Sequence, residues 1–282
     1  MPTIVEIIKK SEQFLRNRGI SSPRLDTELL IGDALNLDRL QLYMKFDLPL
    51  TEIELSHIRE RIKRRAQREP IAYILGHKEF YANRFTVLPG VLCPRPDTET
   101  LIEVALNHIP QDETFYIADV GSGSGCIGLS LALEREKVNV YAIDISPIAL
   151  QCTQKNVEDL SLTHRVAVLK GHYLDPIPPH RPIDMIVSNP PYIPSEDIDS
   201  LAPEVSKHEP KIALDGGKDG LACYRALAVQ SASRAIKCVI VEIGYDQANS
   251  VRAIFEQRGY TVHCFQDLSG QDRVILAQRE AE

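Results

Sequence analysis

The sequence predicts a doubly wound α/β domain with a seven-stranded sheet, preceded by a small all-helical domain. Three observations lead to this fold class. In the first 80 residues, apolar side chains recur at helical spacing. From Phe115 onward, short apolar runs alternate with helical stretches, which is typical of a parallel sheet with helices on both faces. The last two apolar runs leave no room for a helix between them, so they must form an antiparallel hairpin.

The composition is that of a soluble folded protein. Of the 282 residues, 44% are hydrophobic and 25% are charged, which is close to the average of globular domains. The apolar runs are far shorter than the roughly 20 residues that cross a bilayer. Met1–Lys10 has its acidic residue and its lysines in the wrong places for a secretory signal. We therefore expect a cytoplasmic protein with no membrane partner.

Neither cysteines nor histidines form a metal-binding pattern. The six cysteines include no C-x-x-C pair, and the eight histidines lack i, i+4 spacing, so we expect free thiols and no metal. The net charge is −7, divided into +2 for residues 1–80 (14 Lys/Arg, 12 Asp/Glu) and −9 for residues 81–282 (18 against 27). This balance argues against a stable nucleic-acid partner, and we expect a monomer.

The first domain is predicted to consist of short helices. Apolar residues from Ile4 to Leu15 mark one helix, a second runs from about Pro23 to Ala34, and a third lies between Thr51 and Arg68. Residues Ile71 to Val91 change to an apolar and aromatic pattern with Asn and Gly, which predicts a linking hairpin. We place the domain boundary near residue 85, giving a helical domain 1–84 and an α/β domain 85–282.

The second domain is predicted from its alternation of strands and helices. The expected strands are Phe115–Val120, Val138–Ile143, Arg165–Leu169, Ile183–Ser188, Cys238–Ile243, Tyr260–Phe265 and Arg273–Ala277. The expected helices are Cys126–Glu134, Pro147–Glu158, Leu221–Arg234 and Gln247–Arg258. Ligands of such sheets bind beyond the carboxyl ends of the strands. Functional residues are therefore expected directly after each strand.

A glycine-rich loop follows the first predicted strand. Its sequence is Asp119-Val120-Gly121-Ser122-Gly123-Ser124-Gly125, and a helix begins immediately afterwards. Glycines permit a sharp turn and close approach of a ligand, and a helix N-terminus offers N–H groups to a carboxylate or phosphate. The alternatives are a tight turn without a ligand and a dinucleotide site, because Gly123, Gly125 and Gly128 also satisfy G-x-G-x-x-G.

Two further residues favour an adenosine cofactor. Asp144 ends the second strand, where a carboxylate can accept hydrogen bonds from both ribose hydroxyls. Its alternative is a helix cap, because Ser146 and Pro147 follow. Tyr173, after the third strand, is placed to pack on an adenine ring, although it can also be an ordinary half-buried tyrosine.

The fourth strand ends in Asn189-Pro190-Pro191-Tyr192, the most informative motif of the chain. Prolines fix φ and lack N–H groups, so the neighbouring carbonyls point in set directions. The Asn189 side chain and the Pro190 main chain supply two acceptors that match a planar NH₂ group, and Tyr192 supplies an aromatic face. The alternative is a proline turn without a ligand.

Two other segments have open interpretations. The long stretch Asn189 to Gly216 has little periodicity, so we expect a rim or lid over the acceptor site rather than a disordered insertion. The basic run Arg59–Arg68 (RERIKRRAQR) is either the solvated face of a helix or a contact for an acidic protein or RNA.

These motifs together resemble a known family. The glycine loop followed by Asn-Pro-Pro-Tyr is similar to the S-adenosylmethionine-dependent N-methyltransferases of planar amide and amine nitrogens. The chain more closely resembles the peptide chain release factor glutamine-N5 methyltransferases (the PrmC/HemK family) in Gln67–Phe80 (QREPIAYILGHKEF), Pro94–Glu99 (PRPDTE), Glu209-Pro210 and Ala213–Arg225 (ALDGGKDGLACYR). The resemblance covers essentially the whole chain, and it implies a Rossmann-like methyltransferase fold with a terminal antiparallel hairpin.

The resemblance also implies roles for single residues. The methionine part of S-adenosylmethionine would be held by Gly121, Ser122, Gly123, Ser124 and Gly125. Asp144 would hold the ribose, Tyr173 the adenine neighbourhood, and Asn189 would also touch the cofactor. The acceptor, the glutamine of the Gly-Gly-Gln motif in class 1 release factors, would be bound by Asn189, Pro190, Pro191 and Tyr192, with Asn189 and Pro190 as the catalytic pair. His172 departs from the family, which more often has an acidic residue there.

The resemblance implies release factors as protein substrates, and residues 1–84 as the domain that recognises them. Two rival functions remain. A methyltransferase of another planar NH₂ group, in a ribosomal-protein glutamine or a nucleic-acid adenine, would use the same acceptors. A binding module without chemistry would not be expected to retain both the glycine loop and Asn189–Tyr192.

Overall fold

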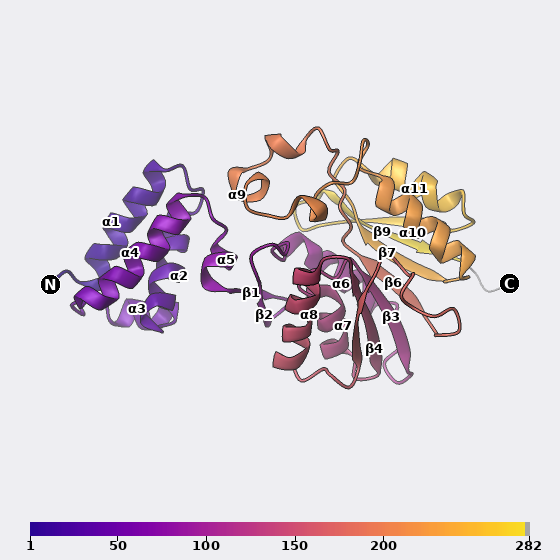
Figure 1. Ribbon diagram of the computed structural model, residues 1–282, viewed down its shortest axis with the longest axis horizontal. Coiled ribbons are helices and arrows are strands. Elements are labelled where there is room, and N and C mark those ends of the chain that lie inside the picture. Colours follow the sequence, from indigo (N-terminus) through magenta and orange to yellow (C-terminus); the bar gives the residue numbers. More distant parts are fainter. Residues whose placement is uncertain (280–282) are drawn as a thin grey trace. The chain divides into compact units, whose positions relative to one another are not determined.

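The computed structural model describes residues 1–279 (Figure 1). It divides into two compact units. The first unit consists of Met1–His77 together with Ala202–His208. The second consists of Lys78–Leu201 and the chain from Glu209 onward. A short segment from the middle of the catalytic half of the sequence therefore folds as part of the helical unit.

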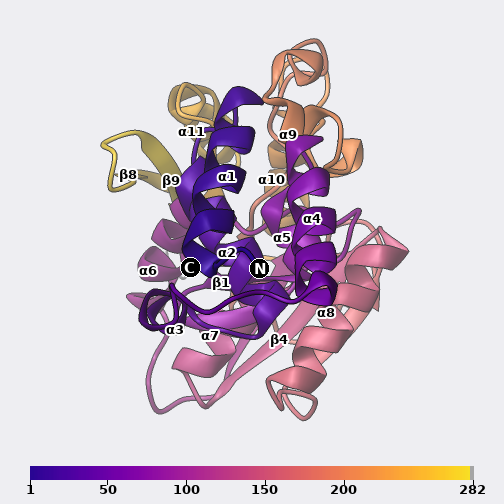
Figure 2. The same cartoon turned by 90° about the vertical axis from the view of Figure 1, so that its left-hand side faces the viewer.

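The first unit is all-helical, as predicted. Its helices are α1 (Ile4–Asn17), α2 (Pro23–Leu35), α3 (Arg39–Met44), α4 (Glu52–Ala66), α5 (Ile71–Leu75) and α9 (Pro203–Ser206). Capping boxes begin α1, α3 and α4 at Thr3, Asp38 and Thr51, because these side chains satisfy the N–H groups of the first turn. Buried side chains such as Ile8, Leu30 and Ile58 form the core of this unit. They belong to the helices α1, α2 and α4, which contact one another and whose ribbons face the viewer in Figure 2.

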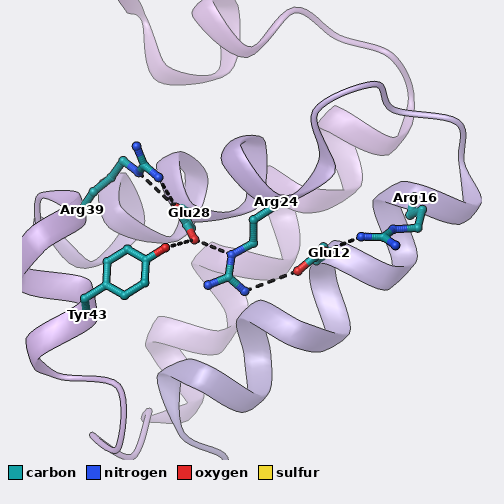
Figure 3. A network of polar contacts seen from close by, with 6 residues as sticks. All are labelled: Glu12, Arg16, Arg24, Glu28, Arg39 and Tyr43. Atoms are coloured by element: carbon teal, nitrogen blue, oxygen red, sulfur yellow. Dashed lines mark hydrogen bonds and ion pairs between the residues drawn. The ribbon is translucent and has the colours of Figure 1, made fainter.

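A polar network around a buried carboxylate extends over three helices of this unit (Figure 3). Glu28 of α2 is 1% exposed and accepts hydrogen bonds from Arg24, Arg39 and Tyr43. Arg24 also reaches Glu12 of α1 at 3.3 Å. Burial alone would raise the pKa of Glu28, but these hydrogen bonds outweigh it and the pKa is lowered. The charge is therefore kept in the interior by partners from its own helix and from α3.

The basic run Arg59–Arg68 forms ion pairs within the same unit. All five of its arginines have acidic partners there: Arg59 with Glu52, Arg61 with Asp33, Arg64 with Glu69, Arg65 with Asp26 and Glu204, and Arg68 with Glu204. Neither sequence interpretation anticipated this internal pairing, because three of the partners, Asp26, Asp33 and Glu204, lie far away along the chain. Of the run, Arg59 and Lys63 remain exposed on α4.

The predicted hairpin at Ile71–Val91 is correct only in part. Its first residues, Ile71–Leu75, form helix α5 instead, between Pro70 at the N-cap and Gly76 with φ +75° at the C-cap. The hairpin itself is β1 (His77–Phe80) with β2 (Asn83–Thr86). Phe80 and Phe85 are buried in the core of the second unit. The division at His77 therefore precedes the expected boundary near residue 85.

The second unit contains the predicted seven-stranded sheet, in the order β5-β4-β3-β6-β7-β9-β8. Its strands are β3 (Phe115–Val120), β4 (Val138–Asp144), β5 (Val166–Lys170), β6 (Met185–Ser188), β7 (Cys238–Glu242), β8 (Thr261–Gln266) and β9 (Asp272–Gln278). The first five are parallel, and β9 pairs antiparallel with both β7 and β8. The terminal hairpin is therefore confirmed.

Helices cover both faces of this sheet (Figure 1). Side chains of α6 (Glu99–Leu106), α7 (Cys126–Glu134) and α8 (Pro147–Asp159) pack with one set of strand residues, including Ile117 and Val140. Side chains of α10 (Ala222–Ser233) and α11 (Ala248–Glu256) pack with the alternate set, including Ala118 and Val239. Helix α6 was not predicted. Within residues 1–279, no helix has the length and apolar character needed to span a membrane.

Candidate active site

A cavity of about 290 Å³ lies in the second unit beyond the carboxyl ends of β3, β4 and β6. The chain continues from β3 to β4 and β5 on one side and to β6 on the other. The cavity thus lies where the strand order reverses, the usual ligand position in doubly wound sheets. Most of the predicted site residues line it, namely Gly121, Ser122, Gly123, Ser124, Asp144, Tyr173, Asn189, Pro190 and Pro191.

The glycine loop turns the chain from β3 into α7. The N–H groups of Gly121 and Ser122 both donate to the carbonyl of Ile143, at 2.8 and 2.9 Å. Gly121 has φ +75°, and a Cβ there would meet no atom within 4 Å. The glycine is therefore required by its backbone conformation, and it leaves open space beside the main chain for a ligand.

Gly125 does not line the cavity and has a structural position instead. It caps α7 with φ +82°, and a Cβ there would lie 3.0 Å from the side chains of Leu129 and Thr153. Gly128 is equally restricted, because its Cβ would lie 2.9 Å from Asp119 Oδ2. Gly128 thus allows α7 to pack closely on the sheet, and Gly125 allows the start of α7 to approach α8.

Asp119 lies fully buried beneath the loop. Its Oδ2 accepts the Gly128 N–H at 2.9 Å, whereas its Oδ1 has no hydrogen-bond partner in the structure. Burial raises the pKa of Asp119 to about 7, and the neighbouring Asp144 carboxylate adds to the rise. The sequence places Asp119 at the start of the glycine-loop motif but assigns it no role.

Asp144 connects the second strand to the glycine loop. Its Oδ2 accepts the Gly123 N–H and its Oδ1 accepts the Ser146 N–H, both at 2.9 Å. The N-cap of α8 is Ser146, whose hydroxyl accepts from the Ala149 N–H, so Asp144 is not the helix cap considered above. The carboxylate is partly exposed and lines the cavity, where each oxygen retains a lone pair for a ligand hydroxyl.

Tyr173 lines another part of the cavity, together with Gly171 and His172. Its backbone has φ +47°, which is uncommon for a residue other than glycine. Its hydroxyl lies 3.7 Å from Cys223 Sγ on α10. The side chain of Tyr173 thus contacts α10, whose Cys223 also lines the cavity.

Asn189 and the two prolines follow β6 directly. Asn189 Nδ2 donates to Thr98 Oγ1 at 3.2 Å. Tyr192 does not line the cavity; its hydroxyl lies 3.4 Å from Glu242 Oε1, and its carbonyl accepts from Gln247 Nε2 at 2.9 Å. The structure therefore brings Asn189, Pro190 and Pro191 to the cavity and directs the polar contacts of Tyr192 elsewhere.

Two rim segments contribute lining residues that the sequence did not assign individually. One is Val91, Leu92, Cys93, Pro94, Arg95 and Thr98, and the other is Pro210, Ile212, Ala213 and Asp215. An ion pair of 2.5 Å between Arg95 and the buried Glu209 joins them. The second segment belongs to the stretch expected to form a rim. The signal for both was present in the family motifs Pro94–Glu99 and Glu209-Pro210, which carried no assigned function.

The chain that follows Asn189–Pro191 packs closely, main chain against main chain, on the glycine-rich segment before α10. Gly216 donates its N–H to the carbonyl of Ile193 at 2.8 Å. A Cβ on Gly220 would lie 2.3 Å from the carbonyl oxygen of Tyr192. Because no larger residue fits there, the Gly-rich segment before α10 fixes the main chain after Asn189.

The residues around the cavity fit an adenosine-bearing cofactor. Gly121 leaves open space at the main chain, Asp144 offers carboxylate oxygens, and Tyr173 offers an aromatic ring. Among the described residues, no group of three or more His, Cys, Asp or Glu side chains is arranged to hold a metal ion. The chemistry of the lining therefore matches an organic ligand with hydroxyl groups and a planar ring.

Two family models match the chain, the PrmC N-terminal domain over residues 6–76 and the Methyltransferase small domain over residues 83–260. The release factor glutamine methyltransferase of Geobacter sulfurreducens is 42% identical over 278 residues, covering 97% of this chain and 95% of the relative. That of Moorella thermoacetica is 39% identical over 286 residues, covering 99% and 100%.

Among solved structures, the hMettl16 catalytic domain in complex with an RNA hairpin has a TM-score of 0.59 at 16% identity, covering 79% of this chain and 83% of that chain. This likeness is one of fold. The closer sequence relatives align over nearly their whole length and include both units, so the chain belongs to the release factor glutamine methyltransferase family.

Proposed function

We propose that this chain transfers a methyl group from S-adenosylmethionine to the side-chain nitrogen N5 of the glutamine in the Gly-Gly-Gln motif of class 1 release factors. The observation that carries the proposal is the meeting of two motifs in one cavity. The glycine loop after β3 and Asn189-Pro190-Pro191 after β6 both line it. Membership of the release factor glutamine methyltransferase family supports the choice of acceptor.

The chain's own residues account for binding of the cofactor. Gly121 to Ser124 would hold the methionine part beside the main chain, and Asp144 would accept from the ribose hydroxyls. Tyr173 would pack near the adenine. When bound, this cofactor supplies an electrophilic methyl group on a positively charged sulfur.

Asn189 and Pro190 would bind the acceptor amide. An amide nitrogen is a poor nucleophile, because its lone pair is delocalised with a rotational barrier of about 18–20 kcal/mol. Two fixed acceptor oxygens on its N–H groups bind more strongly as positive charge develops on the nitrogen. Such preferential binding of the transition state raises the rate.

The rigid prolines supply orientation. Displacement at the methyl carbon needs the amide nitrogen in line at about 3 to 3.5 Å, and Pro190 and Pro191 restrict φ on both sides of the acceptor carbonyl. No general base is needed before the transfer, since the cationic product amide is acidic enough to lose its proton to water. The chain's contribution is thus positioning and acceptor geometry.

The helical unit would recognise the release factor. A cavity of about 320 Å³ lies between α1 and α4, with Ile7, Leu55, Ile58 and Ile62 in its lining. Phe14, which is 41% exposed, also lines it. The cations Lys10, Arg59 and Lys63 complete the lining. An acidic surface of a release factor with a protruding apolar side chain fits this arrangement.

A methyl-transfer assay tests the proposed function. Labelled S-adenosylmethionine is incubated with the chain and with a class 1 release factor, a ribosomal protein or DNA as acceptor. We expect label in the release factor alone, and none in a release factor whose Gly-Gly-Gln glutamine is replaced by alanine. Comparable labelling of the ribosomal protein or of DNA would favour the rival acceptors. With a release factor as substrate, we propose that the reaction takes place in the cytoplasm.

A further inference from the structure

Two hydrogen bonds connect Asn189 to a buried carboxylate. Asn189 Nδ2 donates to Thr98 Oγ1 at 3.2 Å, and Thr98 Oγ1 donates to Glu242 Oε2 at 2.5 Å. Thr98 is 2% exposed and Glu242 is 1% exposed. The three residues come from separate elements: Asn189 follows β6, Thr98 ends the 3₁₀ turn Pro96–Thr98, and Glu242 ends β7.

The chemistry of these groups fixes the direction of both hydrogen bonds. An ionised carboxylate only accepts, so the single proton of the Thr98 hydroxyl is directed to Glu242. Toward Asn189 the hydroxyl then offers only a lone pair, and only the NH₂ half of the Asn189 amide can face it. The oxygen Oδ1 is consequently left for the cavity that Asn189 lines.

We propose that Thr98 and Glu242 are positioning residues that hold the Asn189 amide with Oδ1 toward the acceptor amide of the substrate. This inference rests on the proposed function. In the opposite orientation Asn189 would present NH₂ to the substrate's NH₂, donor against donor, close to a cationic sulfur. Such an arrangement binds neither the amide nor the charge that develops on it.

The surroundings of Glu242 connect this orientation to pH. Thr98 and Asp97 face the carboxyl from the 3₁₀ turn, Tyr192 from the chain after β6, and Arg273 from β9. The Tyr224 hydroxyl of α10 donates to the main-chain carbonyl of Glu242. Burial raises the pKa of Glu242 to about 7, against the lowering effects of Thr98 and Arg273.

Protonation of Glu242 would reverse the hydrogen bond between Thr98 and Glu242. A protonated Glu242 can donate to Thr98, and the hydroxyl is then free to donate to Asn189 Oδ1, which turns the amide away from its productive orientation. The ionised form of Glu242 supports catalysis, so kcat falls as the pH drops through about 7 and Glu242 becomes protonated.

A matched pair of variants at Thr98 tests the proposal. Thr98→Val keeps the shape and removes the hydroxyl, and we expect kcat on the release factor to fall roughly 10- to 100-fold. Thr98→Ser restores the hydroxyl and should recover most of that loss. The affinity for S-adenosylmethionine, measured by calorimetry, should change less than threefold in both variants, because the relay acts on Asn189 and not on cofactor binding.

Ser231→Ala is the control for losing a buried hydroxyl. Ser231 is fully buried on α10 and donates to the Ala228 carbonyl outside the cavity lining. We expect its kcat to equal that of the wild type. A Thr98→Val variant within threefold of wild type, or equal losses in the Val and Ser variants, would overturn the positioning role.

The pH profile gives a second, independent measurement. In Glu242→Gln the amide oxygen can still accept from Thr98, so activity should persist while the acid limb near pH 7 disappears from kcat. An acid limb that remains in this variant would belong to another group and would overturn the role of Glu242. A wild-type chain that binds S-adenosylmethionine but leaves the release factor unmethylated would overturn the proposed function, and this inference with it.

Discussion

Asn189 has both ends of its side-chain amide assigned by the structure and by the proposed reaction. Its NH₂ donates to Thr98, and in the proposed reaction its oxygen accepts from the substrate amide. The side chain therefore cannot be replaced by a group that offers only one of these functions.

Substitution of Asn189 should separate the two functions. We expect Asn189→Ala to lower kcat by roughly 10² to 10³, the loss typical of one preorganised polar group. Asn189→Asp keeps an acceptor oxygen but has no NH₂ for Thr98, and it adds a negative charge that stabilises the reactants as well as the transition state. The expected order of kcat is Asn, then Asp, then Ala.

Single-turnover rates with saturating cofactor measure this order directly. Cofactor affinity should change less than kcat. An Asn189→Ala variant within a few-fold of wild type would mean that Asn189 only shapes the turn after β6, and that another group binds the substrate nitrogen.

Asp144 should govern cofactor affinity. Asp144→Ala removes the acceptor for ribose hydroxyls and also the partner of the Gly123 and Ser146 N–H groups. We expect the dissociation constant of S-adenosylmethionine to rise at least 10- to 100-fold, equivalent to about 1.4 to 2.8 kcal/mol. Asp144→Asn keeps one acceptor oxygen, so its dissociation constant should lie between those of the wild type and of Asp144→Ala.

Calorimetric titration checks this, with Asp159→Asn as the control. Asp159 is exposed at the end of α8 and outside the cavity lining. Its substitution therefore removes the same negative charge without altering any residue that lines the cofactor cavity. Unchanged affinity in Asp144→Ala would refute the ribose assignment. Tighter binding of NAD than of S-adenosylmethionine by the wild type would refute the cofactor.

At the scale of elements, the segment before α10 holds the turn after β6 in place. Gly220 has φ +72°, and an added Cβ would lie 2.3 Å from the Tyr192 carbonyl oxygen. We expect Gly220→Ala to lower the free energy of unfolding by roughly 1 to 3 kcal/mol, and to lower kcat because Tyr192 shares its segment with Asn189.

Gly270→Ala is the matched control for this variant. Gly270 has φ +78°, but a Cβ there would meet nothing within 4 Å. It therefore isolates the cost of the backbone conformation from that of the close contact. Urea denaturation and kcat should show a smaller stability loss and normal activity for Gly270→Ala. Equal effects of the two variants would show that the contact with Tyr192 is unimportant.

Helices and strands whose limits are set by their own residues and immediate neighbours were predictable from the sequence. The continuous apolar run Phe115–Val120 and the helix Cys126–Glu134 have the predicted bounds, because a fully buried strand and a capped helix are specified by neighbouring residues. Helix α5 was mistaken for strand, since its five residues are too few to show a period. Its limits depend on Pro70 and Gly76.

At the scale of the whole molecule, the proposed division of labour predicts a specific loss of activity. A fragment starting at Lys78 retains Phe80 and Phe85, which belong to the core of the second unit. We expect it to bind S-adenosylmethionine and to methylate a short Gly-Gly-Gln peptide. Its kcat/KM on the intact release factor should fall at least tenfold, because the helical unit is missing.

Charge reversal in the full-length chain tests the same assignment without truncation. Arg59→Glu with Lys63→Glu alters two cations beside the cavity between α1 and α4. KM for the intact factor should rise while the peptide reaction stays unchanged. If either variant methylates the intact factor as fast as the wild type, the recognition role of the helical unit is refuted.

The candidate site was only partly accessible to sequence reasoning for a physical reason. Motifs at strand ends could be placed together because parallel strands bring their carboxyl ends to one edge. The link from Asn189 through Thr98 to Glu242 joins residues 91 and 144 positions apart along the chain. No local pattern encodes such contacts, which arise when separate elements pack.

The path of the chain has a consequence for how the protein unfolds. After Leu201 the chain enters the helical unit, where Glu204 pairs with Arg65 and Arg68, and it leaves again at Glu209. Glu209 then pairs with Arg95 on the rim of the cavity. Loss of structure in the helical unit would therefore free the chain before Glu209, which is one end of the rim segment Pro210–Asp215, while the other end stays bonded to Ile193 within the second unit. In thermodynamic terms, local unfolding of the helical unit is linked to added chain entropy at this one end of the rim segment.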